Sequence, residues 1–468
     1  MIWQTLGGIG LFLLGMMLMT DGLKALAGPA LRTILSRFVS SPVAGVGWGA
    51  GVTALVQSSS ATTVTTIGFV SAGLLSFPQA IGVIFGANLG TTSTSWIVSL
   101  LGLKLSIGAV AQPVIFLGVL MRLLSRDRIA ALGLTLAGFG LLFVGLDVLQ
   151  AGMAGLSEHV TPDSFPSASL LGVFMLLGIG IAMTVVVQSS SAAIATTLTA
   201  LHTGNISIDQ AAFLVIGQSI GTCVTAVIAA MGASRAGKRT AAAHVLFNVL
   251  AAAIALPLVP LFVRAAGWAM ERYGLSDTVA IASFHTGFKL AGVLVLLPLI
   301  GPFSRMVERI IPLREPSLVD NLDPNIASVP AVALDAVRST LARTAQALSR
   351  SIRARLVEDR RVSPALLTDA KIALERAVEI LGSLSTQPTV RADWVNQNAM
   401  LHAIDHLSSL LNAAEDQVGL KIMSSDEESR VIAERIQTIL RAIESELTRT
   451  VVRELGLDLD TLFYDTTN

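Results

Sequence analysis

The sequence predicts an all-α fold, a polytopic membrane protein whose chain ends in a helical bundle on the cytoplasmic side. The mean hydropathy of +0.70 is high for a soluble protein. Apolar residues make up 53% of the chain and charged residues only 14%. Apolar stretches of spanning length recur through residues 1–304, whereas the rest of the chain is rich in charge. The 32 basic residues balance 32 acidic ones, so the charge gives no reason to expect a nucleic-acid partner.

Seven stretches have the length and composition of membrane-spanning helices. They are residues 3–21, 79–102, 105–124, 129–150, 209–231, 240–263 and 279–301. Two further apolar stretches, about 45–76 and 170–205, each contain the polar sequence Gln-Ser-Ser-Ser, called here the QSSS motif. We expect each of these two stretches to be a re-entrant hairpin that enters the membrane and returns to the same side.

The distribution of Lys and Arg favours the hairpins. If neither hairpin crosses the membrane, four basic clusters fall on the cytoplasmic side, as the positive-inside rule requires. The clusters are Lys24, Arg32 and Arg37, then Arg122, Arg126 and Arg128, then Arg235, Lys238 and Arg239, and finally Arg305, Arg309 and Arg314. If both stretches crossed, the second cluster would lie outside. The same topology predicts a multi-pass protein of the cell (inner) membrane with its C-terminal domain in the cytoplasm.

An internal repeat indicates how the spans are arranged. The segment 55–98 aligns with 186–229 without a gap, and both QSSS motifs coincide. Upstream of each copy, GGIGLFLLG (7–15) aligns with AGFGLLFVG (137–145). The transmembrane domain, residues 1–304, is therefore predicted to hold repeat one at about 7–125, repeat two at about 137–263 and an extra span at 279–301. Each repeat has three crossings and one hairpin, and because three is odd, the repeats must have inverted topology.

The QSSS motifs carry the chemistry that the apolar segments lack. Within hydrocarbon, irregular backbone is tolerated only where it is buried in protein or lines a hydrated cavity. A broken helix there offers free N–H groups to an anion and free carbonyls to Na⁺, and serine hydroxyls can serve either ion. The alternative is that small polar residues only let helices pack closely. For Thr65, Thr66, Thr196 and Thr197 that alternative stays equally open, whereas the duplication of the motif favours a binding site.

The same residues carry a family resemblance. GVTALVQSSSATT followed by GVIFGANLGTT, and MTVVVQSSSAA followed by GQSIGT, resemble the two signature repeats of the type II sodium/phosphate cotransporters. The similarity covers nearly all of residues 1–304. It implies symport of inorganic phosphate into the cell with sodium as the coupling ion, no other cofactor and no enzymatic activity. Phosphate and sodium would bind between the two hairpins, near the membrane midplane.

The resemblance also implies which residues form the site. The substrate-binding residues would be Gln57, Ser58, Ser59, Ser60, Gln188, Ser189, Ser190 and Ser191. The sodium ligands would be Asn88, Thr91, Thr92, Ser219 and Thr222, together with hydroxyls of the QSSS motifs. Repeat two departs from the usual GANIGTT pattern, because Gln218, Ser219 and Cys223 replace Ala, Asn and the second Thr. As the single cysteine of the chain, Cys223 permits no disulfide within it.

A further layer of residues is expected around the site, formed by Thr62, Thr63, His244 and Asn248. His244 could instead be proton-sensitive, or His244 and His285 could simply hydrogen-bond to neighbouring helices. Lys289 lies in the last span, where an ammonium group is costly unless it is paired or hydrated. Its place about a third of the way into the span slightly favours a side chain that extends to the membrane surface over one that binds the anion.

After a linker at 305–327, residues 328–468 predict a bundle of amphipathic helices near 330–358, 364–385, 392–419 and 426–455. The bundle resembles the helical phosphate-uptake regulator (PhoU-like) domains. Ser408, Ser409 and Asn412 replace the Glu, Arg and Asp usual in the helical signature, so we expect no metal site there. A regulatory or dimerising bundle is expected, which makes a homodimer a candidate assembly.

Three other functions fit parts of the sequence. The protein could transport another small oxyanion with sodium, or it could be a phosphate-sensing membrane regulator. It could also be an intramembrane serine hydrolase, with Ser59 or Ser190 as nucleophile and His244 or His285 as base. A catalytic serine has no reason to be duplicated with its neighbours, so the hydrolase is disfavoured.

Overall fold

The structure of the chain is a computed structural model. It describes residues 1–71, 75–104, 108–157, 159–166, 169–230, 235–312, 318–319, 322, 330–358, 361–384 and 391–416. Every regular element in these ranges is a helix. The chain forms two compact units, Met1–Leu313 and Arg314–Asn468.

The first unit begins with elements that belong to the predicted repeat one. They are α1 (Ile2–Phe38), α2 (Pro42–Val56), α3 (Ser59–Ser71), α4 (Phe77–Gly90), α5 (Ser93–Trp96), a π-helix (Ile97–Lys104) and α6 (Gly108–Leu124). The elements of repeat two follow. They are α7 (Asp127–Leu156), a short 3₁₀ helix (Pro162–Ser164), α8 (Leu170–Val187), α9 (Ser190–His202), α10 (Ile208–Ala230) and α11 (Arg235–Ala255). A 3₁₀ turn (Leu256–Leu258), α12 (Val259–Tyr273), α13 (Asp277–Leu296) and α14 (Ile300–Ile310) complete the unit.

Six helical stretches among the described residues are long and apolar enough to cross a membrane. They are Ile2–Ala27, Asp127–Leu156, Leu170–Val187, Ile208–Ile228, Gly237–Tyr273 and Asp277–Leu296. The chain is therefore a multi-pass membrane protein. The stretch Leu170–Val187 is α8, which the sequence analysis assigns to a hairpin that does not cross, and the predicted spans 79–102 and 105–124 are not among the six.

One predicted span, 79–102, is wrong as a continuous helix, and its break has a local cause. Within 79–102 the hydroxyls of Thr91, Thr92 and Ser93 donate to the carbonyls of Ala87, Leu89 and Gly90, and these competing bonds accompany the end of α4. The predicted span 240–263 lies within the helical stretch Gly237–Tyr273. That stretch passes through a 3₁₀ turn at Pro257, which has no N–H to continue the α-helical ladder.

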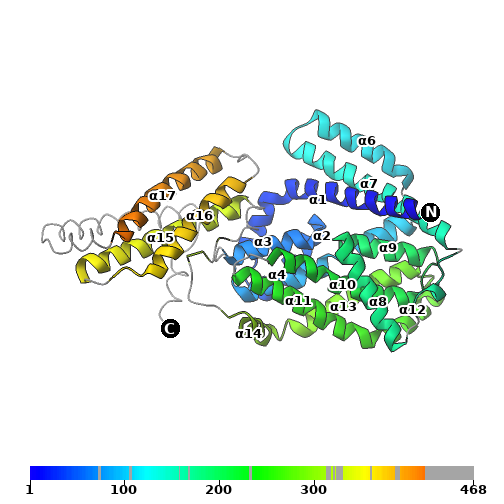
Figure 1. Ribbon diagram of the computed structural model, residues 1–468. Coiled ribbons are helices and arrows are strands. Elements are labelled where there is room, and N and C mark those ends of the chain that lie inside the picture. The colour runs from blue at the N-terminus through cyan, green and yellow to red at the C-terminus, as the bar shows by residue number, and fades with distance from the viewer. Residues whose placement is uncertain are drawn as a thin grey trace. The chain divides into compact units, whose positions relative to one another are not determined.

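Helices α1 and α7 pack against each other, and α6 packs on the other side of α7 (Figure 1). Glycines allow the backbones of α1 and α7 to approach closely. A Cβ atom added at Gly8 would lie 2.5 Å from the Leu149 nitrogen, and one added at Gly138 would lie 2.2 Å from the Met19 nitrogen. In the alignment of the repeats Gly138 corresponds to Gly8 and Leu149 corresponds to Met19. The contact is thus reciprocal, as at an interface between elements related by a two-fold axis.

The elements that contain the QSSS motifs also recur in register. Helix α9 begins at Ser190 and ends at His202, the positions that align with the first and last residues of α3, Ser59 and Ser71. Helix α2 packs on α4, and α8 packs on α10. A Cβ atom at Gly86 would lie 2.1 Å from the Val46 carbonyl oxygen, and one at the equivalent Gly217 would lie 2.3 Å from the Leu177 carbonyl oxygen. Both pairs therefore touch through backbone at corresponding places.

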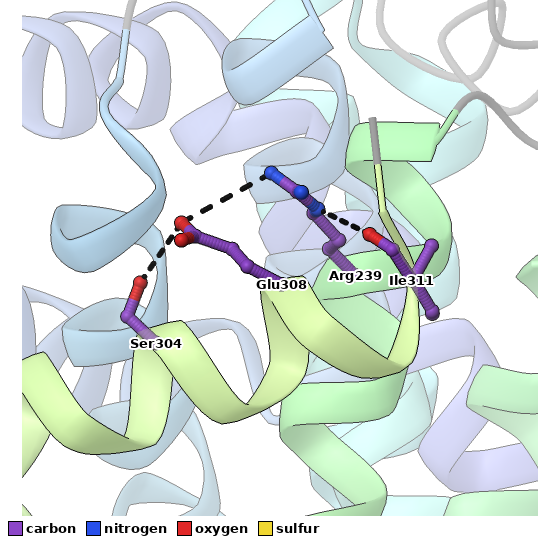
Figure 2. Close-up of polar contacts among 4 residues, drawn as sticks. All are labelled: Arg239, Ser304, Glu308 and Ile311. Atoms are coloured by element: carbon purple, nitrogen blue, oxygen red, sulfur yellow. Dashed lines mark hydrogen bonds and ion pairs between the residues drawn. The ribbon is translucent and has the colours of Figure 1, made fainter. Parts of the chain in front are cut away.

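Helix α14 is amphipathic, with Phe303 and Val307 buried and Ile310 exposed. Figure 2 shows how Arg239, near the start of α11, contacts the C-terminal end of α14. The Arg239 Nε donates to the Ile311 carbonyl oxygen at 2.9 Å, and its guanidinium lies 4.0 Å from Glu308 Oε1. Ser304 donates to the same carboxylate at 3.2 Å. These contacts fix α14 against the membrane helices.

The second unit contains α15 (Pro330–Glu358), α16 (Pro364–Ser383) and α17 (Arg391–Glu415). Each of the three packs on the other two (Figure 1). Leu341, Leu348, Leu374, Ile380 and Leu411 are buried between them. The first three helices predicted for this bundle are present within a few residues of their expected ends. The predicted fourth helix, 426–455, lies outside the described residues.

Candidate substrate and ion site

Each QSSS motif ends one helix and begins the next. Gln57 and Gln188 have φ angles of 57° and 54°, in the left-handed region that side chains other than glycine rarely adopt. They cap the C-termini of α2 and α8. Each glutamine folds its side-chain amide back onto its own helix, donating to the carbonyl oxygens of Ala54 and Val185 respectively. Backbone carbonyls freed at the helix end are thus partly satisfied within the motif.

The serines that follow form the start of the next helix. The Ser58 hydroxyl accepts from the Ala61 N–H at 3.2 Å, and the Ser189 hydroxyl accepts from the Ala192 N–H at 3.3 Å. Ser59 and Ser190 are the first residues of α3 and α9. Each motif therefore presents the N-terminal turn of a helix, where N–H groups and the helix dipole favour an anion.

The two motifs lie around one cavity. It has a volume of about 390 Å³, and all eight residues predicted to bind the substrate line it. Side chains of α1, among them Leu13, Met16 and Thr20, form part of the wall. Hydrogen bonding also joins the repeats directly, because the hydroxyls of Thr94 and Ser191 lie 3.3 Å apart.

A second, small cavity has a volume of about 10 Å³, which is roughly the space of one water molecule. Ser59, Ser190 and Thr222 line both cavities. The rest of its lining consists of Asn88, Thr91, Ile194, Ser219, His285 and Lys289. Six of the nine lining residues carry side-chain oxygen atoms, the ligands that suit a hard cation such as Na⁺.

Four of the five predicted sodium ligands, Asn88, Thr91, Ser219 and Thr222, line the small cavity. Thr92 does not, because its hydroxyl donates to the Leu89 carbonyl oxygen and accepts from Thr286 at 3.1 Å. Thr92 therefore joins α13 to the loop after α4, and its prediction as a ligand is not supported by its position.

Two of the residues predicted to surround the site, Thr62 and Asn248, bond to residues that line the cavities. Thr62 accepts a hydrogen bond from Thr53 at 2.9 Å and donates to the Ser58 carbonyl oxygen at 3.2 Å, so it supports the first motif. Thr63 is buried. His244 and Asn248 are buried on α11, and the Asn248 amide donates to the His244 carbonyl oxygen at 2.9 Å.

The expectation that Lys289 extends to the membrane surface is wrong. Its side chain is 2% exposed and lines the small cavity. Its ammonium group donates to the Asn88 amide oxygen at 3.2 Å and to the Asn248 amide oxygen. The position along the span was misleading because α13 packs against α4, α10 and α11, which enclose the middle of the helix.

Two residues that hold the first motif, Ser93 and Thr94, were not predicted from the sequence. Gln57 Nε2 donates to the Ser93 hydroxyl at 2.8 Å, and the Thr94 hydroxyl donates to Gln57 Oε1 at 2.9 Å. The run GTTSTS, which places five polar side chains after Gly90 in an apolar region, was the available signal. His285 behaves as one alternative expected, since its Nδ1 lies 2.8 Å from the Ser95 hydroxyl of α5. Among the described residues no hydrogen bond joins Ser59 or Ser190 to a histidine, so the hydrolase arrangement is not formed.

Fold and site together define a class of protein, a multi-pass helical membrane protein in which two interrupted helices meet at a polar cavity, as in secondary transporters. The chain belongs to the Na⁺/Pi-cotransporter family, whose profile matches residues 11–151 and 167–288. This membership confirms the resemblance inferred from the QSSS repeats. Proteins of this family and their named relatives are transporters, so the chain is not an enzyme.

Three relatives illustrate the range of similarity. The chain is 34% identical over 305 residues to the Bacillus subtilis "Uncharacterized protein YqeW", covering 64% of this chain and 95% of that protein. It is 31% identical over 343 residues to the Escherichia coli "Putative inorganic phosphate export protein YjbB", covering 73% of this chain and 61% of that protein. It is 38% identical over 98 residues to the rat "Sodium-dependent phosphate transport protein 2A", covering 20% and 15%. No solved structure matches the chain.

Proposed function

We propose that the protein is a sodium-coupled symporter that carries inorganic phosphate into the cell. The observation that carries this proposal is the convergence of both QSSS motifs on one cavity, which all eight of their residues line. Family membership supports phosphate and sodium as the transported pair.

Phosphate would bind between the N-termini of α3 and α9. Ser59 and Ser190 are the residues that would meet it there, since they line both cavities. Two helix N-termini supply N–H donors, and the serine hydroxyls and glutamine amides supply further donors to a tetrahedral oxyanion.

Sodium would bind in the small cavity, where Asn88, Thr91, Ser219 and Thr222 bring oxygen atoms together. The charge of the cation would partly neutralise the anion beside it. Because phosphate and sodium share Ser59, Ser190 and Thr222 as neighbours, the binding of one ion would favour the other, which is the basis of coupling.

We also propose that the repeats have inverted topology and that the QSSS hairpins are re-entrant and meet near the midplane of the cell (inner) membrane. The reciprocal contacts of Gly8 with Leu149 and of Gly138 with Met19 support this arrangement. A two-fold axis that relates antiparallel helices across such a contact lies in the membrane plane. In the same proposal the C-terminal bundle is cytoplasmic and regulatory, and a homodimer is its candidate assembly.

The test is uptake of radiolabelled phosphate by proteoliposomes containing the purified protein. An inward Na⁺ gradient should drive phosphate to a concentration above that outside, and replacing Na⁺ with choline should remove the accumulation. Excess unlabelled phosphate should compete fully, whereas sulfate should not. Competition by another oxyanion in preference to phosphate would favour a transporter of that anion. The absence of any uptake in protein that still binds phosphate would favour a sensor.

Phosphate export is a second candidate, favoured by the name of the Escherichia coli relative, "Putative inorganic phosphate export protein YjbB". A symporter follows the sodium gradient, so an inward gradient gives uptake. Expression in cells without other phosphate transporters separates the two. Growth on low phosphate supports import, whereas increased release of phosphate from loaded cells supports export.

A further inference from the structure

Lys289 places a basic side chain inside the transport unit. It lies on α13, is 2% exposed and has its ammonium group 5.7 and 5.5 Å from the ring centres of Phe247 and Phe288. Among the described residues no carboxylate lies within ion-pair distance of it. A buried charge without a counter-ion is strongly unfavourable in the empty protein, and inside a membrane such charges mark ion pathways.

The partners of the ammonium group are oxygen atoms of the kind that coordinate a hard metal cation. Both are side-chain amide oxygens, from Asn88 of α4 and Asn248 of α11. Asn88 is one of the residues that the family resemblance assigns to sodium, and Ser219 stands at its equivalent place in repeat two. Lys289 itself lies on α13, after the two duplicated segments, so the lysine has no counterpart produced by the repeat.

The ammonium group also lies near residues that are proposed to hold the anion. Lys289 lines the small cavity together with Ser59 and Ser190, the first residues of the two helices that would hold phosphate. The described lining of this cavity contains no Asp or Glu. An oxyanion bound at these N-termini is therefore the counter-charge that the lysine lacks in the empty protein.

We propose that Lys289 is a tethered cation of the substrate site. Its ammonium group occupies a place that amide oxygens would otherwise offer to a sodium ion, and it supplies one positive charge to the bound phosphate. The protein then needs one sodium ion fewer per phosphate than the same site would need without the lysine. This inference rests on the proposed sodium-coupled transport of phosphate.

The test compares Lys289→Gln with the wild type in proteoliposomes, with phosphate uptake measured against Na⁺ concentration. Loss of the tethered charge should leave uptake at high Na⁺ but raise the half-saturating Na⁺ concentration about tenfold. The Hill coefficient for Na⁺ should rise by about one, because a sodium ion takes the vacated place between Asn88 and Asn248. Lys289→Arg should keep the wild-type Hill coefficient.

Asn248→Asp is a second variant that keeps the lysine and places a carboxylate beside it. Asn248→Asp should raise the half-saturating Na⁺ concentration, as Lys289→Gln does, but it should keep the wild-type Hill coefficient because the ammonium group still occupies its place. Lys238→Gln is the matched control, because Lys238 is exposed at the start of α11, away from both cavities. Folding of each variant is checked by gel filtration and by protection against heat by phosphate.

Two results would overturn the inference while leaving the proposed function intact. One is an unchanged Na⁺ dependence in both Lys289→Gln and Asn248→Asp. The other is a folded Lys289→Gln that binds phosphate at no Na⁺ concentration, since sodium could then not replace the lysine. If the wild type itself shows uptake that is independent of Na⁺, the proposed function fails first and the tethered-cation inference fails with it.

Discussion

The two QSSS motifs have the same backbone conformation but differ in the hydrogen bonds made by their glutamine side chains. Both glutamines adopt the left-handed conformation, and both motifs are followed by helices that start at corresponding serines. Gln57, however, is held by Ser93 and Thr94, whereas Gln188 is exposed and its described side-chain bond goes to its own helix. The break itself is therefore local to the motif, whereas the bonds that hold Gln57 come from α5.

The cause of the difference lies after Gly90 and its equivalent, Gly221. In repeat one the helix ends at Gly90, and a short helix and a π-helix follow. In repeat two α10 continues to Ala230, and Val224 stands where Ser93 stands in repeat one. The hydroxyl side chains after Gly90 thus distinguish a motif bonded to α5 from one whose described glutamine side-chain bond stays within its own helix.

The largest expected effect tests whether both motifs are needed. Ser59→Ala and Ser190→Ala should each reduce sodium-driven phosphate uptake to the level of empty liposomes, because each serine lines both cavities. Ser283→Ala is the control, since its hydroxyl donates to the Val279 carbonyl oxygen of its own helix. Uptake at the wild-type rate in either site variant would contradict the site assignment.

The next effect tests whether the repeats pack equivalently. Gly86→Ala and Gly217→Ala should each destabilise the protein by about 2 kcal/mol, because the new methyl group would meet a backbone oxygen. Gly47→Ala and Gly178→Ala are the controls, as nothing lies within 4 Å of a Cβ at either position. Thermal denaturation followed by gel filtration gives the comparison. Equal stability of the test and control variants would show that the close approaches are not present.

Much of this arrangement is predictable from the sequence, because the two repeats have identical residues at many aligned positions. The aligned QSSS motifs and glycines predict where the helices break and where backbones meet, and α3 and α9 fall in matching register. The interruption after Gly90 was not predicted, although the hydroxyl run that causes it is visible in the sequence. The mean hydropathy of the whole segment 79–102 does not reveal that hydroxyl side chains compete locally for the backbone carbonyls.

The position of Lys289 could not be predicted in the same way. Distance from a helix end fixes depth only if the helix faces lipid, and α13 is enclosed by other helices. Its partners, Asn88 and Asn248, are 201 and 41 residues away along the chain. Such a contact depends on tertiary packing, which no local pattern encodes.

A moderate effect is expected from making repeat one resemble repeat two. Ser93→Val removes the hydroxyl that Gln57 Nε2 contacts at 2.8 Å, a loss of about 1 kcal/mol. If that energy positions Gln57 for phosphate, the KM for phosphate should rise about fivefold. The reverse change, Val224→Ser, should alter KM less than about twofold, because the continuous α10 leaves the new hydroxyl to bond within its own helix. Equal effects of the two changes would mean that the motifs are supported alike.

The smallest effect is expected from removing the C-terminal domain. Residues Met1–Leu313 form a compact unit that contains both repeats and both cavities. Deletion of residues 318–468 should therefore leave the initial rate of phosphate uptake within about twofold of the wild type, since every lining residue stays in place. The matched measurement is phosphate uptake by cells grown in low and in high phosphate. If the C-terminal domain is regulatory, its deletion should change the difference in uptake between the two conditions. A folded truncation without uptake in proteoliposomes would show that the two repeats need the second unit to complete their cycle.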